Sequence, residues 1–442
     1  MASPTCNILD LYQQIVTARS LQFFQTNSCR KVRRGIYCAR VVLWMMILQR
    51  LHHRATLSMA VQLLIEGAAG PLMEDCHRVR CGKLSSRTGS YCQARQKLPA
   101  LLCKQVSQQI VEQLQLMMGL DADFPRVVLM DGSSIELEHS RDLLKRYPPA
   151  QNQHGKSHWP VLRIVVAHGV DSGLAHCPCW GPMYGSEAVS EQALAEEMMS
   201  QLKPGTTILA DRNFGVFWVA YQAHQCKLRS IVRLTERRAR KLGGVISEPG
   251  EREVIWKSSK RDGGKARRFE TGSCVSGRLI AARIGRGKSK EWLYLFTTLE
   301  LPWEEVVAIY GRRWNIEMDL RSLKRTVNLH HVDAKSQDML DKELLMAMAA
   351  YNLTQAVMVM AARRHGLAAR QLSFSGVLNV VTCAWPHWME AKTKRQMAKE
   401  IERTLRLAAQ QTLPKRKTPR SYPRAVWRHN QAYPVRPSEK IS

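Results

Sequence analysis

Two short apolar runs each end at an aspartate, and this pair constrains the fold of the chain more than any other feature. Val127–Met130 precedes Asp131, and Thr206–Ala210 precedes Asp211. An apolar run of this length between polar residues is typical of a buried strand. In open α/β sheets, ligands bind where strands end, so two aspartates at strand ends indicate a site. The alternative for each aspartate is that it caps the turn after its strand.

The neighbouring sequence predicts further strands and helices that suit an α/β layer. Apolar runs predict strands, and longer periodic segments predict helices between them. The expected strands cover 161–167, 174–180 and 230–234, and the expected helices cover 186–202 and 216–224. This alternation favours a mixed sheet covered by helices.

Composition changes along the chain predict three regions. The predicted division is a helical N-terminal region at 1–122, whose basic residues favour DNA binding over a merely solvated surface, an α/β region at 123–372 and a basic C-terminal region at 373–442. Inside the α/β region, residues 228–296 are expected to form a basic, β-rich insertion with short strands at 253–257 and 279–284. A solvated loop region is the alternative for that insertion. A long helical region is expected from 303 to 365.

The net charge points to a polyanionic partner. The chain has 66 Lys and Arg residues against 37 Asp and Glu residues, which gives a formal charge of +29. Nucleic acid is the expected partner of so basic a chain, and an anionic membrane surface is the weaker alternative. Basic residues gather at 30–34, at 78–87 and after Ala391, and the proline-rich stretch 413–437 is expected to be extended.

Neither a membrane span nor a disulfide framework is expected. The apolar stretch 344–362 contains Asn352, Thr354 and Gln355, which suit a buried helix better than a membrane. The start of the sequence shows no secretory signal pattern. The 12 cysteines include no C-x-x-C motif, so reduced thiols in the cytoplasm are expected. A metal or redox pair at Cys177 and Cys179 is the alternative for those two residues.

Four polar residues follow one another at helical spacing in the segment IYGRRWNIEMDLRSLKRTV. On a regular helix they would share one narrow face: Tyr310, Arg313, Glu317 and Lys324. The alternative is an ordinary exposed face with an Arg313–Glu317 ion pair.

Glu317 would join Asp131 and Asp211 in a site of three carboxylates. Such a site repels itself unless a divalent cation binds, and hard oxygen ligands suit Mg²⁺ or Mn²⁺. Two ions ~3.5–4 Å apart would clamp the attacking and leaving oxygens of a phosphodiester. Arg313 and Lys324 would then hold DNA phosphates. Glycoside hydrolysis by paired acids is the other use of such carboxylates, but it leaves the charge of +29 unexplained.

The spacing Y-x₂-R-x₃-E-x₆-K resembles the signature of bacterial DDE transposases of the insertion-sequence-4 family. Asp131, in MDGSS, resembles the first catalytic aspartate of that family, and Asp211, in ADRNF, resembles the second. The family more often has glycine where this chain has Asn213. The resemblance covers about residues 120–365.

The resemblance implies a ribonuclease H-like core that cuts and joins DNA with Mg²⁺, for which Mn²⁺ substitutes. It implies cut-and-paste transposition at terminal inverted repeats, by a homodimer in a synaptic complex that also takes up target DNA. By resemblance, the two aspartates and Glu317 would be both catalytic and metal-binding. DNA contacts would come from Tyr310, Arg313, Lys324 and an aromatic residue that receives a flipped base, Trp292 or Tyr294.

Two other functions remain open from the sequence. One is a catalytically inactive DNA-binding repressor derived from a transposase. The other is a ribonuclease H-like nuclease that cuts DNA without joining strands. For Trp292 and Tyr294, a place in the core of the insertion is the alternative to base stacking. The reduced cysteines predict a cytoplasmic protein, and DNA binding would associate it with the nucleoid.

Overall fold

The computed structural model describes most of the chain. The described residues are 8–17, 19–22, 35–52, 55–73, 76–120, 126–152, 155–259, 272–285, 291–327, 329, 332–391 and 393–414. Residues 1–412 form one compact unit and 413–442 a second. The predicted basic cluster at 30–34 lies outside the described residues, as do 260–271 of the insertion and 415–442 of the basic C-terminal region.

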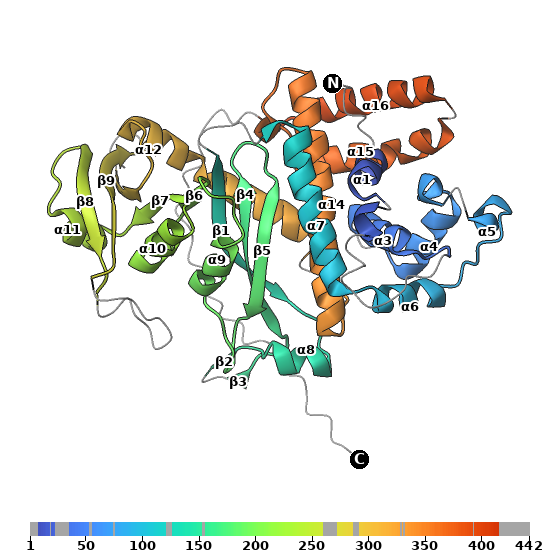
Figure 1. The fold of residues 1–442 in the computed structure, drawn as a ribbon, viewed down its shortest axis with the longest axis horizontal. Helices are drawn as coiled ribbons and strands as arrows, with labels where there is room; N and C mark the ends of the chain where they lie inside the picture. Colours follow the sequence, from blue (N-terminus) through green and yellow to red (C-terminus); the bar gives the residue numbers. More distant parts are fainter. Residues whose placement is uncertain are drawn as a thin grey trace, which may run out of the picture. The chain divides into compact units, whose positions relative to one another are not determined.

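Eight strands form one mixed sheet in the order β5-β4-β1-β6-β7-β10-β9-β8 (Figure 1). β1 is parallel to β6 and β6 is parallel to β7, whereas the other neighbours are antiparallel. This confirms the predicted mixed α/β layer. The strands are β1 (Val127–Glu136), β4 (Val161–Gly169), β5 (Ala175–Pro182), β6 (Thr207–Ala210), β7 (Arg229–Leu234), β8 (Gly250–Lys257), β9 (Cys274–Ile284) and β10 (Glu291–Thr297), with a separate small hairpin of β2 (Gln151–Asn152) and β3 (Gly155–Lys156).

Alternate residues of β1 face opposite layers of helices, as the period of a strand requires. Val128 and Met130 pack with α9 (Glu191–Met199) and α10 (Phe217–Gln225). Val127 and Leu129 pack with α12 (Trp303–Gly311) on the other face. Asp131 continues the second series, so its side chain belongs to the face that α12 covers.

Helices before and after the sheet pack around one long helix, α14 (Gln337–Arg364). It is long and apolar enough to cross a membrane, but 94% of its most apolar window is buried, as expected for a core helix. The elements in contact with it are α1 (Ile8–Ile15), α3 (Ala39–Leu51), α6 (Gly89–Lys97), α7 (Ala100–Met117), α8 (Arg141–Arg146), α15 (Phe374–Glu390), α16 (Lys394–Ala409) and the 3₁₀ turn η6 (Ala369–Gln371). The N-terminal region also contains α4 (Leu57–Ile65), which packs on α3, the short helix α5 (His77–Arg80) and the 3₁₀ turn η1 (Gly70–Leu72).

The β-rich segment expected at 228–296 extends the main sheet. Its strands β8 and β9 include the short strands expected at 253–257 and 279–284. β10 pairs with β7, so hydrogen bonds run without interruption from the first half of the sheet into this segment. A single helix, α11 (Glu236–Gly243), lies between β7 and β8.

Two expectations about element boundaries are wrong. The strand expected to end at Asp131 continues to Glu136, because β4 supplies antiparallel partners along its whole length while pairing with β6 stops at Met130. The expected helix from 303 to 365 is interrupted several times. After α12 come a 3₁₀ turn, η4 (Arg312–Trp314), then α13 (Asn315–Arg321) and a π-helical turn, η5 (Ser322–Thr326), before α14 begins.

Candidate active site

Asp131 lies within β1, and Asp211 directly follows the end of the adjacent parallel strand β6. Met130 of β1 is the register partner of Ala210 of β6. Neighbouring strands lie about 4.8 Å apart, so the residues that follow these partners are side by side. The structure therefore brings together the two aspartates singled out in the sequence.

Both aspartates accept a hydrogen bond from a neighbouring backbone N–H, but only Asp211 caps a turn after its strand, because β1 continues past Asp131. Oδ1 of Asp131 accepts a hydrogen bond of 2.8 Å from the N–H of Gly132. Oδ1 of Asp211 accepts one of 2.8 Å from the N–H of Asn213. Capping and ligand binding are compatible, because each carboxylate has a second oxygen.

The surroundings of Asp131 raise its pKa to about 6 from an ordinary value of 3.8. Burial is the largest cause, and the negative charges of Asp211 and Glu191 act in the same direction. The N–H of Gly132 and the guanidinium of Arg313 lower the pKa and offset part of this effect. A carboxylate that is hard to ionise next to a second one is the electrostatic environment that a cation would relieve.

Two members of the Tyr-Arg-Glu-Lys series lie at the aspartates. The positive charge of Arg313 lowers the pKa of Asp131. The guanidinium of Arg313 lies 4.7 Å from the ring centre of the exposed Trp314. Tyr310 is buried against the sheet, and burial raises its pKa although Arg313 and Arg233 favour its ionised form. The arrangement places one cation and one phenol beside the carboxylate pair.

Glu317 occupies a different position from the aspartates. It lies on α13, directly after the buried Ile316, and its own side chain is exposed. Within the described ranges, no three His, Cys, Asp or Glu side chains are grouped closely enough to hold a metal ion. The structure thus brings two of the three predicted carboxylates together and leaves the third on the helix that covers them.

The expectation that the four residues share one regular helical face is wrong, because η4 and η5 change the helical twist on both sides of α13. A π-helical turn holds an additional residue per turn, and such turns are frequent at functional sites. Here it buries Leu323 and directs Lys324 toward β1, where Nζ lies 3.2 Å from Oγ of Ser133. Burial lowers the pKa of Lys324, and the charge of Glu136 opposes that shift.

Trp292 lies on β10, away from the elements that carry the aspartates. Its ring stacks with that of Tyr294 at 5.9 Å, and the guanidinium of Arg283 lies 4.4 Å from its ring centre. Trp292 is half-buried against a core cluster, and Tyr294 is a buried member of that cluster.

The sequence interpretation missed a further carboxylate, Glu191. It begins α9, and it acts on Asp131 through its charge. A Cβ atom on Gly132 would lie 2.7 Å from its carboxyl carbon, so a larger residue there would displace the Glu191 side chain. Asn213, the residue that departs from the family pattern, donates its side-chain amide to Oε2 of Glu191. A signal in the sequence was the N-terminal position of Glu191 in its helix, right after the capping Ser190.

Cys177 and Cys179 are packing residues. Cys177 has a φ of 45°, within a bulge of β5, and the Sγ of Cys179 donates to its carbonyl oxygen at 3.5 Å. Burial raises the pKa of both thiols to about 12, so they are protonated and poor metal ligands at neutral pH.

A family model described as "Transposase DDE domain" matches residues 122–353, which is more than half of the chain. The chain belongs to this transposase family. The matched region contains β1, β6 and α13 and therefore both aspartates and Glu317.

Among curated proteins, the chain is similar to "Transposase InsG for insertion sequence element IS4" of Escherichia coli (strain K12). The two are 27% identical over 297 residues, which is 64% of this chain and 63% of that protein. The match thus spans less than two thirds of the relative, and it confirms the resemblance to the insertion-sequence-4 family. Among solved structures, a chain in "Cryo-EM structure of piggyBac transposase synaptic complex with hairpin DNA (SNHP)" aligns with a TM-score of 0.44 and 10% identity, over 91% of this chain and 86% of that one.

Proposed function

We propose that this protein is a DNA transposase that moves an insertion sequence by cut-and-paste transposition. The observation that carries the proposal is the pair Asp131 and Asp211, which directly follow the register partners Met130 and Ala210 and lie near Arg313, in a chain of the transposase DDE domain family. The antiparallel meander β5-β4-β1 followed by the parallel β6 and β7 supports a ribonuclease H-like core.

The donor set fits Mg²⁺ or Mn²⁺. Carboxylate oxygens are the ligands that these cations prefer. Burial first, and then the negative charges of Asp211 and Glu191, raise the pKa of Asp131, and a bound cation would offset both effects. Asp131 and Asp211 would hold the metal, and Glu317 would complete the site by turning its exposed side chain toward them. A bound divalent cation would supply Lewis-acid stabilisation of phosphodiester oxygens and lower the pKa of a water molecule.

The protein's own cations and aromatic side chains would position the DNA. Arg313 and Lys324 lie on the face of the sheet that holds the aspartates and would bind phosphates, with Tyr310 beside them. Trp292 would stack on a flipped base. The charge of +29 supports binding to terminal inverted repeats and target DNA through the helical N-terminal and basic C-terminal regions. We propose a homodimer in the synaptic complex and action at the nucleoid.

The test uses the inverted repeats that flank the protein's own coding region, on a labelled linear duplex. Purified protein is added with Mg²⁺, Mn²⁺ or EDTA, and both cleavage at the repeat boundary and joining to a second duplex are measured. The proposal expects both reactions with either metal and neither with EDTA. Tight binding without cleavage would favour the inactive repressor, and cleavage that ignores the repeat and joins nothing would favour a simple nuclease.

A further inference from the structure

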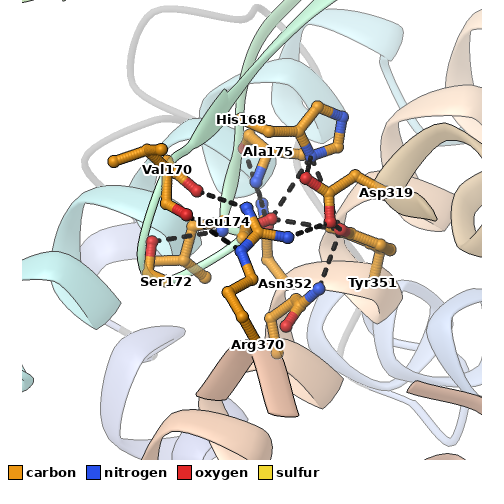
Figure 2. A network of polar contacts seen from close by, with 12 residues as sticks. His168, Val170, Ser172, Leu174, Ala175, Asp319, Tyr351, Asn352 and Arg370 are labelled. Atoms are coloured by element: carbon orange, nitrogen blue, oxygen red, sulfur yellow. Dashed lines mark hydrogen bonds and ion pairs between the residues drawn. The ribbon is translucent and has the colours of Figure 1, made fainter. Parts of the chain in front are cut away.

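A carboxylate lies buried two residues after Glu317. Asp319 is only 3% exposed, on the side of α13 that packs inward. A buried ionised group is costly unless charged and polar partners compensate it. The described residues around Asp319 supply such partners, and Figure 2 shows them converging on its side chain.

Arg370 is the main partner. Nη1 of Arg370 forms an ion pair with Oδ1 of Asp319. The other nitrogens of the same guanidinium reach the backbone of the turn after β4: Nη2 donates to the carbonyl oxygen of Gly169 at 2.7 Å, and Nε donates to that of Val170 at 2.9 Å. One side chain therefore joins α13 to the end of β4.

Two further side chains close the network. The hydroxyl of Tyr351, on α14, lies 3.3 Å from Oδ1 of Asp319 and 3.1 Å from the carbonyl oxygen of Gly173. Nδ1 of the buried His168 lies 3.9 Å from Oδ2 of Asp319. Burial lowers the pKa of His168, so Arg370 supplies the positive charge that Asp319 needs.

Arg370 contacts the end of β4, and β4 is the strand that pairs antiparallel with β1. Gly169 is the register partner of Val128, and the N–H of Val170 donates to the carbonyl oxygen of Val127 at 3.0 Å. Asp131 follows these residues on the same strand. A short path of hydrogen bonds and one ion pair thus connects Asp319 on α13 with the strand that carries Asp131.

We propose that Asp319 and Arg370 are positioning residues that fix Glu317 relative to Asp131. This inference rests on the proposed function. α13 has only seven residues and lies between a 3₁₀ turn and a π-helical turn, so its own hydrogen bonds hold it weakly. The Asp319–Arg370 pair supplies the tertiary anchor that such a helix lacks, and it does so at the residue next but one to Glu317.

Asp319→Asn tests the proposal, because it keeps the size of the side chain and removes the charge. Glu343→Gln is the matched control. Glu343 is also buried and paired with two arginines, at 2.8 Å to Arg50 and 2.6 Å to Arg95, but it joins α14 to the N-terminal helices. Both variants should lower the melting temperature. Only Asp319→Asn should lower single-turnover cleavage per folded molecule, by about tenfold at saturating protein, since small displacements of reacting groups have effects of this size.

Two readouts separate positioning from general loss of structure. The Kd for the end duplex should stay within about twofold of wild type in Asp319→Asn, because the DNA-binding cations are retained. Hydrogen exchange should become faster at 315–321 in this variant but not in Glu343→Gln. Arg370→Lys, which keeps the charge and loses the carbonyl contacts, takes the place of Asp319→Asn if that variant does not fold.

The outcomes for the inference and for the proposed function are distinct. Wild-type cleavage together with undiminished cleavage by folded Asp319→Asn would overturn the inference alone. No cleavage by the wild type would overturn the proposed function, and hydrogen exchange would then decide the inference. Unchanged exchange at 315–321 would overturn it.

Discussion

Met130 of β1 and Ala210 of β6 are register partners in a parallel pair, so Asp131 and Asp211, the next residue on each chain segment, emerge side by side. The ionised form of Asp131 is unfavourable there, because burial and, to a smaller extent, the charges of Asp211 and Glu191 raise its pKa to about 6. Strongly shifted carboxylates are common at functional sites, and under the proposed function a divalent cation would relieve this one.

Asp131→Asn should stabilise the metal-free protein. In the folded state the pKa of Asp131 is raised from 3.8 to about 6, so the folded protein binds the proton more tightly than the unfolded chain. The contribution of Asp131 to the free energy of unfolding is therefore fully present below pH about 4 and is lost as the pH rises through about 6. Replacing the carboxylate should add about 1–3 kcal/mol at pH 8 and little at pH 4, measured by urea unfolding in EDTA. Asp333→Asn, at an exposed position, should change stability by less than about 0.5 kcal/mol at either pH.

Cleavage should depend on the ionisation of Asp131. Metal binding needs the carboxylate, so below pH about 6 a proton competes with the cation. Single-turnover cleavage should fall about tenfold per pH unit below that value, whereas DNA binding should not fall with it. A pH profile that is flat between 5 and 7 would show that Asp131 does not limit the reaction.

Arg313→Ala should have two separable effects. Loss of one phosphate contact should reduce the slope of log Kd against log salt by about one. Arg313 also lowers the pKa of Asp131, so its removal should move the midpoint of the cleavage profile to higher pH. Lys335→Ala, which removes an exposed cation elsewhere, controls for the change in net charge. An unchanged midpoint would show that Arg313 does not influence the ionisation of Asp131.

Alanine substitutions at Gly215 and Gly311 should change the stability of the protein in opposite directions. A Cβ on Gly215 would lie 2.0 Å from the carbonyl oxygen of Arg233, so the turn that carries Asp211 must move. We expect Gly215→Ala to destabilise the protein by about 1–3 kcal/mol and to impair cleavage. Gly311 has helical backbone angles and open space where a Cβ would lie, so Gly311→Ala should stabilise by about 0.4–1 kcal/mol. Thermal unfolding of the two variants checks both signs.

Short-range patterns predicted most of the fold. Apolar runs and their flanking polar residues predicted β1, β4, β5, β6 and β7, because strands buried in a sheet need continuous apolar sequence, and longer periodic segments predicted α9 and α10. The pairing of β10 with β7 could not be predicted, since the partners lie about 60 residues apart and nothing local specifies them. For the same reason the continuation of β1 to Glu136 depends on β4 and is invisible in the sequence of β1 alone.

The site was predictable in part. The apolar runs before Asp131 and Asp211 were informative because they pair in parallel register and place the two aspartates side by side, although β1 does not end at Asp131. The prediction that Tyr310 and Lys324 lie on one regular helical face was wrong, because it assumed a constant helical twist that η4 and η5 break.

Asp319 left a signal that the sequence interpretation did not use. It lies three residues after Ile316 and four before Leu323, both buried, so it falls within an apolar stripe where a carboxylate requires a partner. Arg370, the partner, is 51 residues away and only the folded structure identifies it.

The most direct test of the proposed catalytic centre is the cleavage of end duplex by Glu317→Gln. The variant is compared with wild type and with Glu304→Gln, which changes an exposed glutamate on the neighbouring α12. Cleavage in Mg²⁺ and Mn²⁺ and binding in EDTA are measured on the same labelled duplex. We predict that Glu317→Gln binds DNA as wild type does and cleaves at least about a hundredfold more slowly, while Glu304→Gln does both normally. Wild-type cleavage by Glu317→Gln would contradict a catalytic centre formed by Asp131, Asp211 and Glu317.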